Sequence, residues 1–442
     1  MAFNFLRLSV LFLILITFSI SPLAASILET AENTDTLFHP TIKSMIDQVD
    51  QAQSYTLMGD LSGEWPVSIG GQMFRLETRD ALSGESNQKA AEYLFQYYQA
   101  LGLETSYQNF TFQDHTLSNV VAEKAGTIFP ERVFMITSHF DDVPVTPPAP
   151  GADDNASGTA AVMLAASILS KHEFGCTLRF ANFNAEEYGL IGSKVYARRT
   201  YCAGEDLLGV LNLDMIAWNS LYSPPEVDLH INPSLPGSST MGNLFAEVVN
   251  TYGLQLIPTD ADPATNRSDH FSFWQLGYPA ILVSEDLNDF NPYYHSPEDR
   301  IGNLQDFDYY VEMIKASLGT LAHSGCLVED GWGSISGQVT SLQTQDPIPG
   351  ANLSLTNPEW AYTFTTQADE HGYYQFSALA GTHILTADSI DFKSKQLEVL
   401  VTENQDSIVD LELNSQVERV LYLPLTGDWL VIQKPGCPEL TE

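Results

Sequence analysis

The amino-acid sequence predicts an α/β protein: a three-layer fold around a central, mostly parallel sheet, followed by a C-terminal all-β sandwich domain. From about Ile42 to Cys326, apolar runs alternate with helical patterns, which is typical of α/β layer folds. From Glu329 onward the pattern changes to short alternating strands broken by Gly, Pro and Asp/Asn turns. That pattern indicates a small sandwich of about 85 residues.

Each element of the first domain has its own signal. Residues 87–103 carry apolar side chains at helical spacing, and the small side chains of residues 155–172 let a helix pack closely on a sheet. Residues 132–140 (RVFMITSHF) are almost continuously apolar, as suits a central parallel strand. We expect further central strands at 177–183, 207–216 and 278–286, and a closing helix at 307–324.

The N-terminus has the layout of a secretory signal peptide. Residues 1–26 contain one basic residue, Arg7, then an apolar run over residues 8–20 and small residues up to Ser26. We expect cleavage near Ala25 or Ser26 and a secreted protein, extracellular or periplasmic. A retained membrane anchor is the alternative, and the sequence Ser-Pro-Leu-Ala-Ala-Ser argues against it. The expected organisation is a signal peptide (1–26), a catalytic domain (27–328), a β-sandwich (329–414) and a tail (415–442).

The net charge of the chain limits the classes of partner that we expect. The 442 residues include 56 acidic and 19 basic ones, a formal net charge of −37. Such a surface repels nucleic-acid phosphates and anionic lipid heads, so we expect neither as a partner. No segment after the leader is long and apolar enough to span a bilayer, so we expect no stable membrane insertion.

Four cysteines follow the leader, and disulfides are permitted in an exported chain. Cys176 opens an expected strand, and Cys202 follows the helix that returns antiparallel to it. Both would then lie at one end of the same β-α unit. We therefore expect a Cys176–Cys202 bridge, which leaves Cys326–Cys437 by elimination.

Titratable side chains gather where the expected central strands end. In an open α/β sheet, sites form beyond the carboxyl ends of the strands, so these groups should meet at one edge. They are His139 and Asp141, Asp153 and Asp154, Glu186 and Glu187, Asp214, and His295.

The types of these side chains suit a pair of divalent ions. Imidazoles and carboxylates without a nearby cysteine are donors for zinc or a similar ion in hydrolytic chemistry. Two ions that share one carboxylate would lie about 3.5–4 Å apart and would need one further carboxylate to take the proton of a water. Adjacent Glu186 and Glu187 repel each other unless a cation or water offsets their charge, so they fit this arrangement.

The motifs together resemble a known family. HFDD (139–142), GADDNASG (151–158), NAEEYGLIGS (184–193), LNLDMIAW (211–218) and YYHSPEDR (293–300) are similar to those of secreted zinc aminopeptidases with a co-catalytic metal pair. That family includes bacterial leucyl aminopeptidases and is related to glutamate carboxypeptidases and glutaminyl cyclases. The resemblance covers about residues 40–326 and implies peptide substrates and two zinc ions.

The resemblance also implies a role for each motif residue. His139 and Asp214 would hold one zinc ion, Glu187 and His295 the other, and Asp153 would bridge them. Glu186 would be the general base, and a cis peptide bond would join Asp153 to Asp154. Asp141, two residues after His139, is placed to accept the second ring N–H of that imidazole.

The sequence does not favour the other histidines as metal ligands. His270 is a weaker candidate ligand because the expected ligand count is already filled. His172, His230, His323 and His371 have no partners at suitable spacing, so we interpret them as structural.

The sequence favours an aminopeptidase and leaves alternatives open. Arg267 and Arg300 lie near the motifs and could read a terminal carboxylate, so a carboxypeptidase or dipeptidase is the second hypothesis. A glutaminyl cyclase, which normally uses a single zinc ion, and a non-catalytic binding protein are further alternatives. The β domain resembles the transthyretin-like regulatory domain of secreted carboxypeptidases, on GSISGQV, PIPGANLSL and ADEHGYYQFSALAGTHILTA.

Overall fold

The structure is a computed structural model that describes residues 37–143, 148–328, 331–356 and 363–415. The expected signal peptide (1–26) lies outside the described residues, as does the expected tail apart from Ser415. Across the described part of the chain, no helix is long and apolar enough to cross a membrane.

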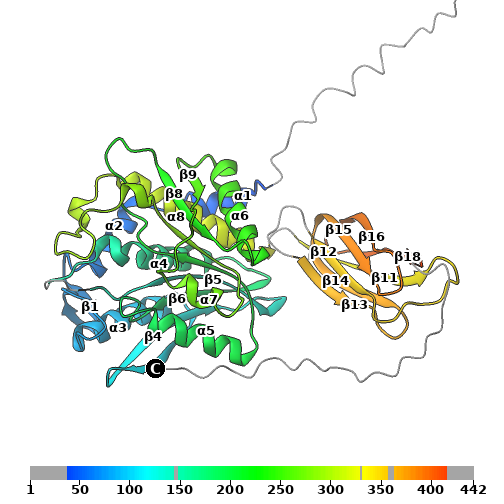
Figure 1. The fold of residues 1–442 in the computed structure, drawn as a ribbon, viewed down its shortest axis with the longest axis horizontal. Coiled ribbons are helices and arrows are strands. Elements are labelled where there is room, and N and C mark those ends of the chain that lie inside the picture. The colour runs from blue at the N-terminus through cyan, green and yellow to red at the C-terminus, as the bar shows by residue number, and fades with distance from the viewer. Residues whose placement is uncertain (1–36, 144–147, 329–330, 357–362, 416–442) are drawn as a thin grey trace, which may run out of the picture. The chain divides into compact units, whose positions relative to one another are not determined.

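An eight-stranded sheet forms the centre of the first domain (Figure 1). Its strands are β3 (Glu104–Phe112), β4 (His115–Lys124), β5 (Phe129–His139), β6 (Cys176–Phe183), β7 (Asp206–Leu213), β8 (Glu226–Ile231), β9 (Ile257–Asp260) and β10 (Ala280–Glu285). They lie in the order β3-β4-β6-β5-β7-β10-β8-β9. The central strands β6, β5, β7 and β10 are parallel, whereas β4 and β8 pair antiparallel to their inner neighbours. A separate short hairpin pairs β1 (Val67–Ile69) with β2 (Gln72–Phe74).

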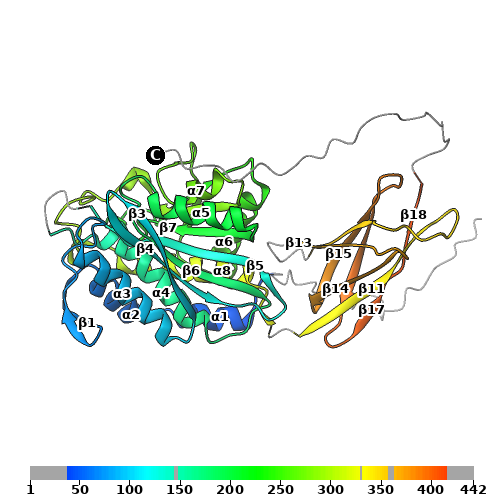
Figure 2. The same ribbon diagram turned by 90° about the horizontal axis from the view of Figure 1, so that it is seen from below.

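Helices cover both faces of this sheet. On one face lie α1 (Pro40–Ile46), α2 (Gln51–Leu61), α3 (Glu85–Ala100), α4 (Gly158–Leu169), α6 (Pro236–Tyr252) and α8 (Phe307–Ser324). The other face carries α5 (Ile191–Ala203) and α7 (His270–Trp274). Figure 2 shows α5 and α7 on the side of the sheet away from α3 and α4. This confirms the predicted three-layer fold.

The two faces of strand β6 explain why the predicted disulfide is wrong. Cys176, Leu178 and Phe180 point into the core shared with α4 and α8, whereas Ala181 and Phe183 point toward α5. Cys202 lies on α5, so it is on the opposite side of the sheet from the Cys176 thiol.

Cys176 instead meets Cys326. The chain leaving α8 returns to the start of β6, where Gly175 donates its N–H to the Cys326 carbonyl at 2.7 Å. The two sulfur atoms are 2.6 Å apart. The Cys326–Cys437 pairing, which rested on elimination, is therefore also contradicted, and Cys437 lies outside the described residues.

The second domain consists of two sheets. One contains β14 (Tyr373–Leu379), β11 (Trp332–Ser341) and β17 (Asp406–Ile408), with β18 (Leu411–Leu413) also paired to β11. The other has the order β13 (Thr363–Gln367), β12 (Asn352–Thr356), β15 (Gly381–Asp388) and β16 (Lys395–Val401). Buried and exposed residues alternate along β14, as expected for a strand with one face in a core. The predicted all-β domain is confirmed.

Candidate metal centre

The loops beyond the central strands converge on one cluster of imidazoles and carboxylates. His139 is the last residue of β5, and Asp214 directly follows β7. Glu186 and Glu187 lie in the turn between β6 and α5. His295 lies in the loop after β10, so the cluster is built from segments far apart in the sequence.

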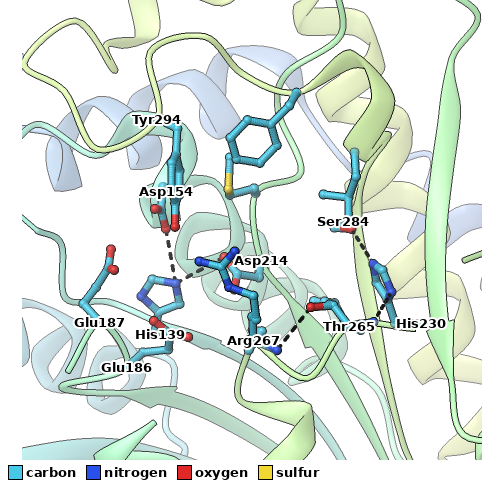
Figure 3. A pocket seen from close by; sticks show the side chains of 15 residues that line it. His139, Asp154, Glu186, Glu187, Asp214, His230, Thr265, Arg267, Ser284 and Tyr294 are labelled. Carbon is cyan, nitrogen blue, oxygen red and sulfur yellow. Dashed lines mark hydrogen bonds and ion pairs between the residues drawn. The ribbon is translucent and has the colours of Figure 1, made fainter. Parts of the chain in front are cut away.

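Asp154 lies between the two imidazoles. Its Oδ1 is 3.3 Å from Nε2 of His139, and its Oδ2 is 3.1 Å from Nε2 of His295. His139 Nε2 is also 3.2 Å from Asp214 Oδ1, and His295 Nε2 is 3.0 Å from Glu187 Oε2. The cluster thus contains two groups of three donors, each with one imidazole and two carboxylates, which share Asp154. Figure 3 shows the first group, His139, Asp154 and Asp214, with Glu187 nearby.

Glu186 completes the cluster as a carboxylate outside these two groups. An oxygen of Glu186, a ring nitrogen of His139 and an oxygen of Glu187 all lie within 4.8 Å of one another. Glu186 is therefore close to both groups without being the shared carboxylate.

The central position of Asp154 corrects the predicted role of Asp153. The Asp153 carboxylate points away from the imidazoles and accepts hydrogen bonds from the Ala217 N–H at 2.9 Å and from Nδ2 of Asn291 at 2.8 Å. The cis peptide bond joins Asp154 to Asn155, one bond later than predicted. The chain turns sharply over Ala152–Ser157, so two adjacent aspartates face different surroundings.

Asp141 lies beside His139, but its contacts differ from the prediction. Nδ1 of His139 is 3.2 Å from the backbone carbonyl oxygen of Asp141 and 3.6 Å from its carboxylate. The carboxylate accepts the N–H of Glu186 at 3.0 Å and that of Glu187 at 3.4 Å. Asp141 thus orients the imidazole through its backbone and fixes the two glutamates through its side chain.

The protonation of the cluster follows from burial and mutual repulsion. Burial and the neighbouring Asp154 together raise the pKa of Glu187 to about 8, although the His295 hydrogen bond acts in the opposite direction. Burial likewise raises the pKa of Glu186 well above its usual range, with added repulsion from Asp214 and Asp269. Burial lowers the pKa of His295, but contacts with Asp154 and Glu187 outweigh it and bring the pKa to about 10. Carboxylates in this state are stabilised by a cation, and the donor set fits zinc.

A second set of buried acids supports the turn that carries Asp154, a role that was not predicted from the sequence. The Asp299 carboxylate accepts the N–H groups of Asp153 and Asp154 at 3.1 Å each. Glu285 accepts the N–H of Asn291 at 3.1 Å, and Asn291 in turn binds Asp153. Asp299 lies within the YYHSPEDR motif, four residues after His295, but its role was not predicted because it acts through backbone N–H groups of a distant loop.

Buried Arg79 ties two of the site's loops together. Its guanidinium donates to the carbonyls of Phe140 (2.6 Å), Pro150 (2.8 Å) and Gly151 (2.9 Å). It also lies 3.4 Å from the Asp142 carboxylate. Arg79 therefore holds the chain after His139 against the chain before Asp154.

A pocket extends from the cluster along the sheet (Figure 3). His230 and Ser284 lie at the end away from the cluster, with Thr265 and Arg267 between the two ends. Apolar side chains complete the lining: Met215, Leu282, Leu287 and Phe290. His230, interpreted from the sequence as structural, therefore lines the pocket, and its place on a strand beside the site was the missed signal.

Two further sequence candidates are placed by the structure. Nε2 of His270 bonds the Thr265 carbonyl at 3.0 Å, and His270 belongs to neither group of three donors. Arg300 pairs with Glu64 at 3.6 Å, whereas Arg267 lines the pocket.

The fold and this site define an α/β domain with a cluster of imidazole and carboxylate groups that could hold metal, and two family models match the chain. Residues 119–312 match Peptidase family M28, and residues 334–414 match the carboxypeptidase regulatory-like domain. The chain therefore carries a peptidase M28 domain followed by a carboxypeptidase regulatory-like domain, as the sequence motifs predicted.

Individual relatives are distant. A probable zinc metalloprotease of Pyrenophora tritici-repentis is 28% identical over 246 residues, covering 47% of this chain and 51% of that protein. Leucine aminopeptidase 1 of Trichophyton equinum is 28% identical over 199 residues, covering 42% of this chain and 53% of the other. The chain thus spans about half the length of the curated relatives it matches.

Solved structures share the fold. The LapA aminopeptidase of Legionella pneumophila superposes with a TM-score of 0.54 at 18% identity, covering 65% of this chain and 75% of that one. A zinc aminopeptidase from Bacillus subtilis gives a TM-score of 0.51 at 16% identity, covering 61% and 94%.

Proposed function

We propose that this protein is a secreted zinc aminopeptidase that removes N-terminal residues from peptides, with Glu186 as general base. The single observation that carries the proposal is the position of Asp154, which offers one oxygen to the His139 group and the other to the His295 group. A carboxylate shared between two such donor sets is the arrangement that a co-catalytic ion pair requires.

The donor set fits two zinc ions. His139 and Asp214 would hold one ion and Glu187 and His295 the other, with Asp154 between them. The buried Oε1 of Glu187 has no hydrogen-bond partner among the described residues, in keeping with a charged ligand at this point. When bound, the zinc pair polarises the scissile carbonyl and makes water more acidic.

The protein's own groups then move the proton. The Glu186 carboxylate accepts the proton of the attacking water and delivers it to the leaving amine. Asp141 keeps Glu186 in place by accepting its backbone N–H. Burial raises the pKa of Glu186, which strengthens the carboxylate as an acceptor for the proton of water.

An aminopeptidase is favoured over an enzyme that reads a C-terminus. Four carboxylates line the pocket. Asp154, Glu187 and Asp214 are assigned to the ions, so Glu186 is the one acidic group among the described lining residues that is left to meet a free amine. The names of the relatives, leucine aminopeptidase and zinc aminopeptidase, support the same choice.

Arg267 favours a second candidate, a dipeptidase or carboxypeptidase on the same site. It lines the pocket as the one arginine among its described residues, and a guanidinium binds a carboxylate well. The N-terminal leader motivates secretion in either case.

The decisive test uses leucine p-nitroanilide with the wild type, Glu186→Gln and the exposed control Glu247→Gln, with zinc counted in each. We expect Glu186→Gln to keep two zinc ions per chain and to lose activity by at least about 100-fold, the lower range for a general base. A wild type that binds two zinc ions but cleaves only N-blocked peptides would establish the carboxypeptidase. A wild type without metal would refute both proposals.

A further inference from the structure

The end of the pocket farthest from the metal centre is built by two paired strands. Strands β8 and β10 are antiparallel, with Leu282 opposite His230 and Ser284 opposite Asp228. Directly opposed residues point to the same face of a sheet, so His230 and Ser284 are diagonal neighbours on the pocket side. Figure 3 shows them together across the pocket from His139 and Glu186.

The hydrogen bonds of His230 fix its protonation. Nδ1 accepts the N–H of Thr265 at 3.0 Å, so this nitrogen carries no proton. Burial lowers the pKa of His230, which keeps the ring neutral and places the one ring proton on Nε2. That nitrogen lies 3.3 Å from Ser284 Oγ and donates to it.

Ser284 is left with a proton to donate. Its oxygen accepts from His230, and the hydroxyl makes no further hydrogen bond to the residues that the structure describes. Ser284 is only 4% exposed, so an acceptor brought to this hydroxyl by a ligand would be hydrogen-bonded away from bulk water.

Arg267 lies between the two ends of the pocket, and the groups at the Ser284 end select against a negatively charged ligand group. Leu282, Met215 and Leu287 form apolar walls, suited to methylene groups. Asp228, opposite Ser284, accepts the Leu287 N–H at 3.0 Å, so a carboxylate stands next to the pocket end. A second carboxylate there would meet like charge as well as the cost of burial.

We propose that this end of the pocket binds the side chain of the substrate's N-terminal residue, and that Ser284 selects a neutral side chain tipped with a hydrogen-bond acceptor, such as glutamine. The proposal rests on the aminopeptidase function above. It assigns Ser284 and His230 as specificity-determining residues that take no part in bond cleavage.

Three side chains of matched shape test this. Glutamine, glutamate and homoleucine, in which two methyl groups replace the glutamine amide, are compared as p-nitroanilides. The variants are Ser284→Ala, Ser284→Thr, which keeps the hydroxyl, and Ser234→Ala, a control on the exposed turn beyond β8. Inhibition constants of the free amino acids give a second readout that needs no turnover.

We expect Ser284→Ala to lower the glutamine-to-homoleucine ratio of kcat/KM by roughly three- to tenfold, the range of one neutral hydrogen bond. The preference for free glutamine over free homoleucine, measured by their inhibition constants, should fall by the same factor. Ser284→Thr and Ser234→Ala should keep the wild-type ratio, and glutamate should be the poorest of the three.

Two results would overturn the proposal. One is an unchanged ratio in Ser284→Ala, and the other is a preference for glutamate, which would assign recognition to Arg267. In both, leucine p-nitroanilide is still cleaved, so the aminopeptidase function stands. If the wild type cleaves none of the four substrates, the proposed function itself fails.

Discussion

The carboxylate of Asp141 accepts the backbone N–H of Glu186 at 3.0 Å, so the residue two places after the proposed ligand His139 fixes the start of the glutamate turn. The same carboxylate reaches the N–H of Glu187 at 3.4 Å. One side chain therefore sets the position of both the proposed base and a proposed ligand.

Asp141→Ala should lower kcat by about 10- to 100-fold, the usual effect of removing a group that orients a metal site. The reason is loss of both N–H contacts, which frees the turn. Steady-state kinetics with zinc counting checks this, with the exposed Asp391→Ala as control. An unchanged kcat at full zinc content would show that the turn with Glu186 and Glu187 keeps its position without the Asp141 carboxylate.

Asp154→Asn and Asp153→Asn should behave differently although the two residues are neighbours. Asp154 stands between the imidazoles, so its loss should lower zinc content and reduce activity by at least about 100-fold. Asp153 bonds Ala217 and Asn291, so its variant should keep zinc and lose mainly thermal stability. The measurements are the zinc content and the melting temperature of both variants. If Asp153→Asn loses zinc and Asp154→Asn keeps it, Asp153 is the bridging carboxylate.

Zinc-free protein should lose stability as pH rises from about 4 to about 8. In the fold, burial raises the pKa of Asp153 from 3.8 to about 6 and that of Glu187 from 4.5 to about 8. The folded state then binds more protons than the unfolded one, so its stability is greatest below the unfolded pKa values and falls as these groups ionise.

The zinc-loaded protein should show the opposite trend, because zinc binds the ionised carboxylates and releases their protons. Urea unfolding of both forms across this range is the measurement. Zinc-free protein that gains stability toward pH 8 would contradict the proton assignment.

Arg79→Met should destabilise the protein by about 3–5 kcal/mol, the effect of leaving one member of a buried ion pair alone. The Asp142 carboxylate would keep its hydrogen bonds from Thr78 and from the backbone N–H of residue 79, but it would lose the guanidinium that offsets its buried charge. The double variant Arg79→Met/Asp142→Leu should recover part of the loss, because both charges are then gone. A double-mutant cycle by urea unfolding measures the coupling, and additive effects would refute it.

The sequence predicted the fold because its central strands are continuous apolar runs and its helices have clear spacing. It also predicted that His139, Glu186, Glu187, Asp214 and His295 would meet, since carboxyl ends of parallel strands share one edge. These arguments depend on where elements begin and end, which local patterns encode well.

Other features depend on directions that local patterns do not encode. Asp153 and Asp154 are chemically identical neighbours, and only the turn decides which faces the imidazoles. Asp299 acts through backbone N–H groups more than 140 residues away in the chain. Cys176 and Cys202 lie on opposite faces of the sheet, and β6 is buried on both faces, so its apolar run does not show which face α5 covers.

Strand β10 has a consequence for how this protein could diverge. Its residue Ser284 faces the pocket, whereas the next residue, Glu285, faces the buried acids behind Asp154. The proposed specificity residue and a residue that supports the proposed metal centre therefore lie on opposite faces of one strand. Substitutions on the Ser284 face could therefore change the substrate preference during evolution, while the Glu285 face stays unchanged.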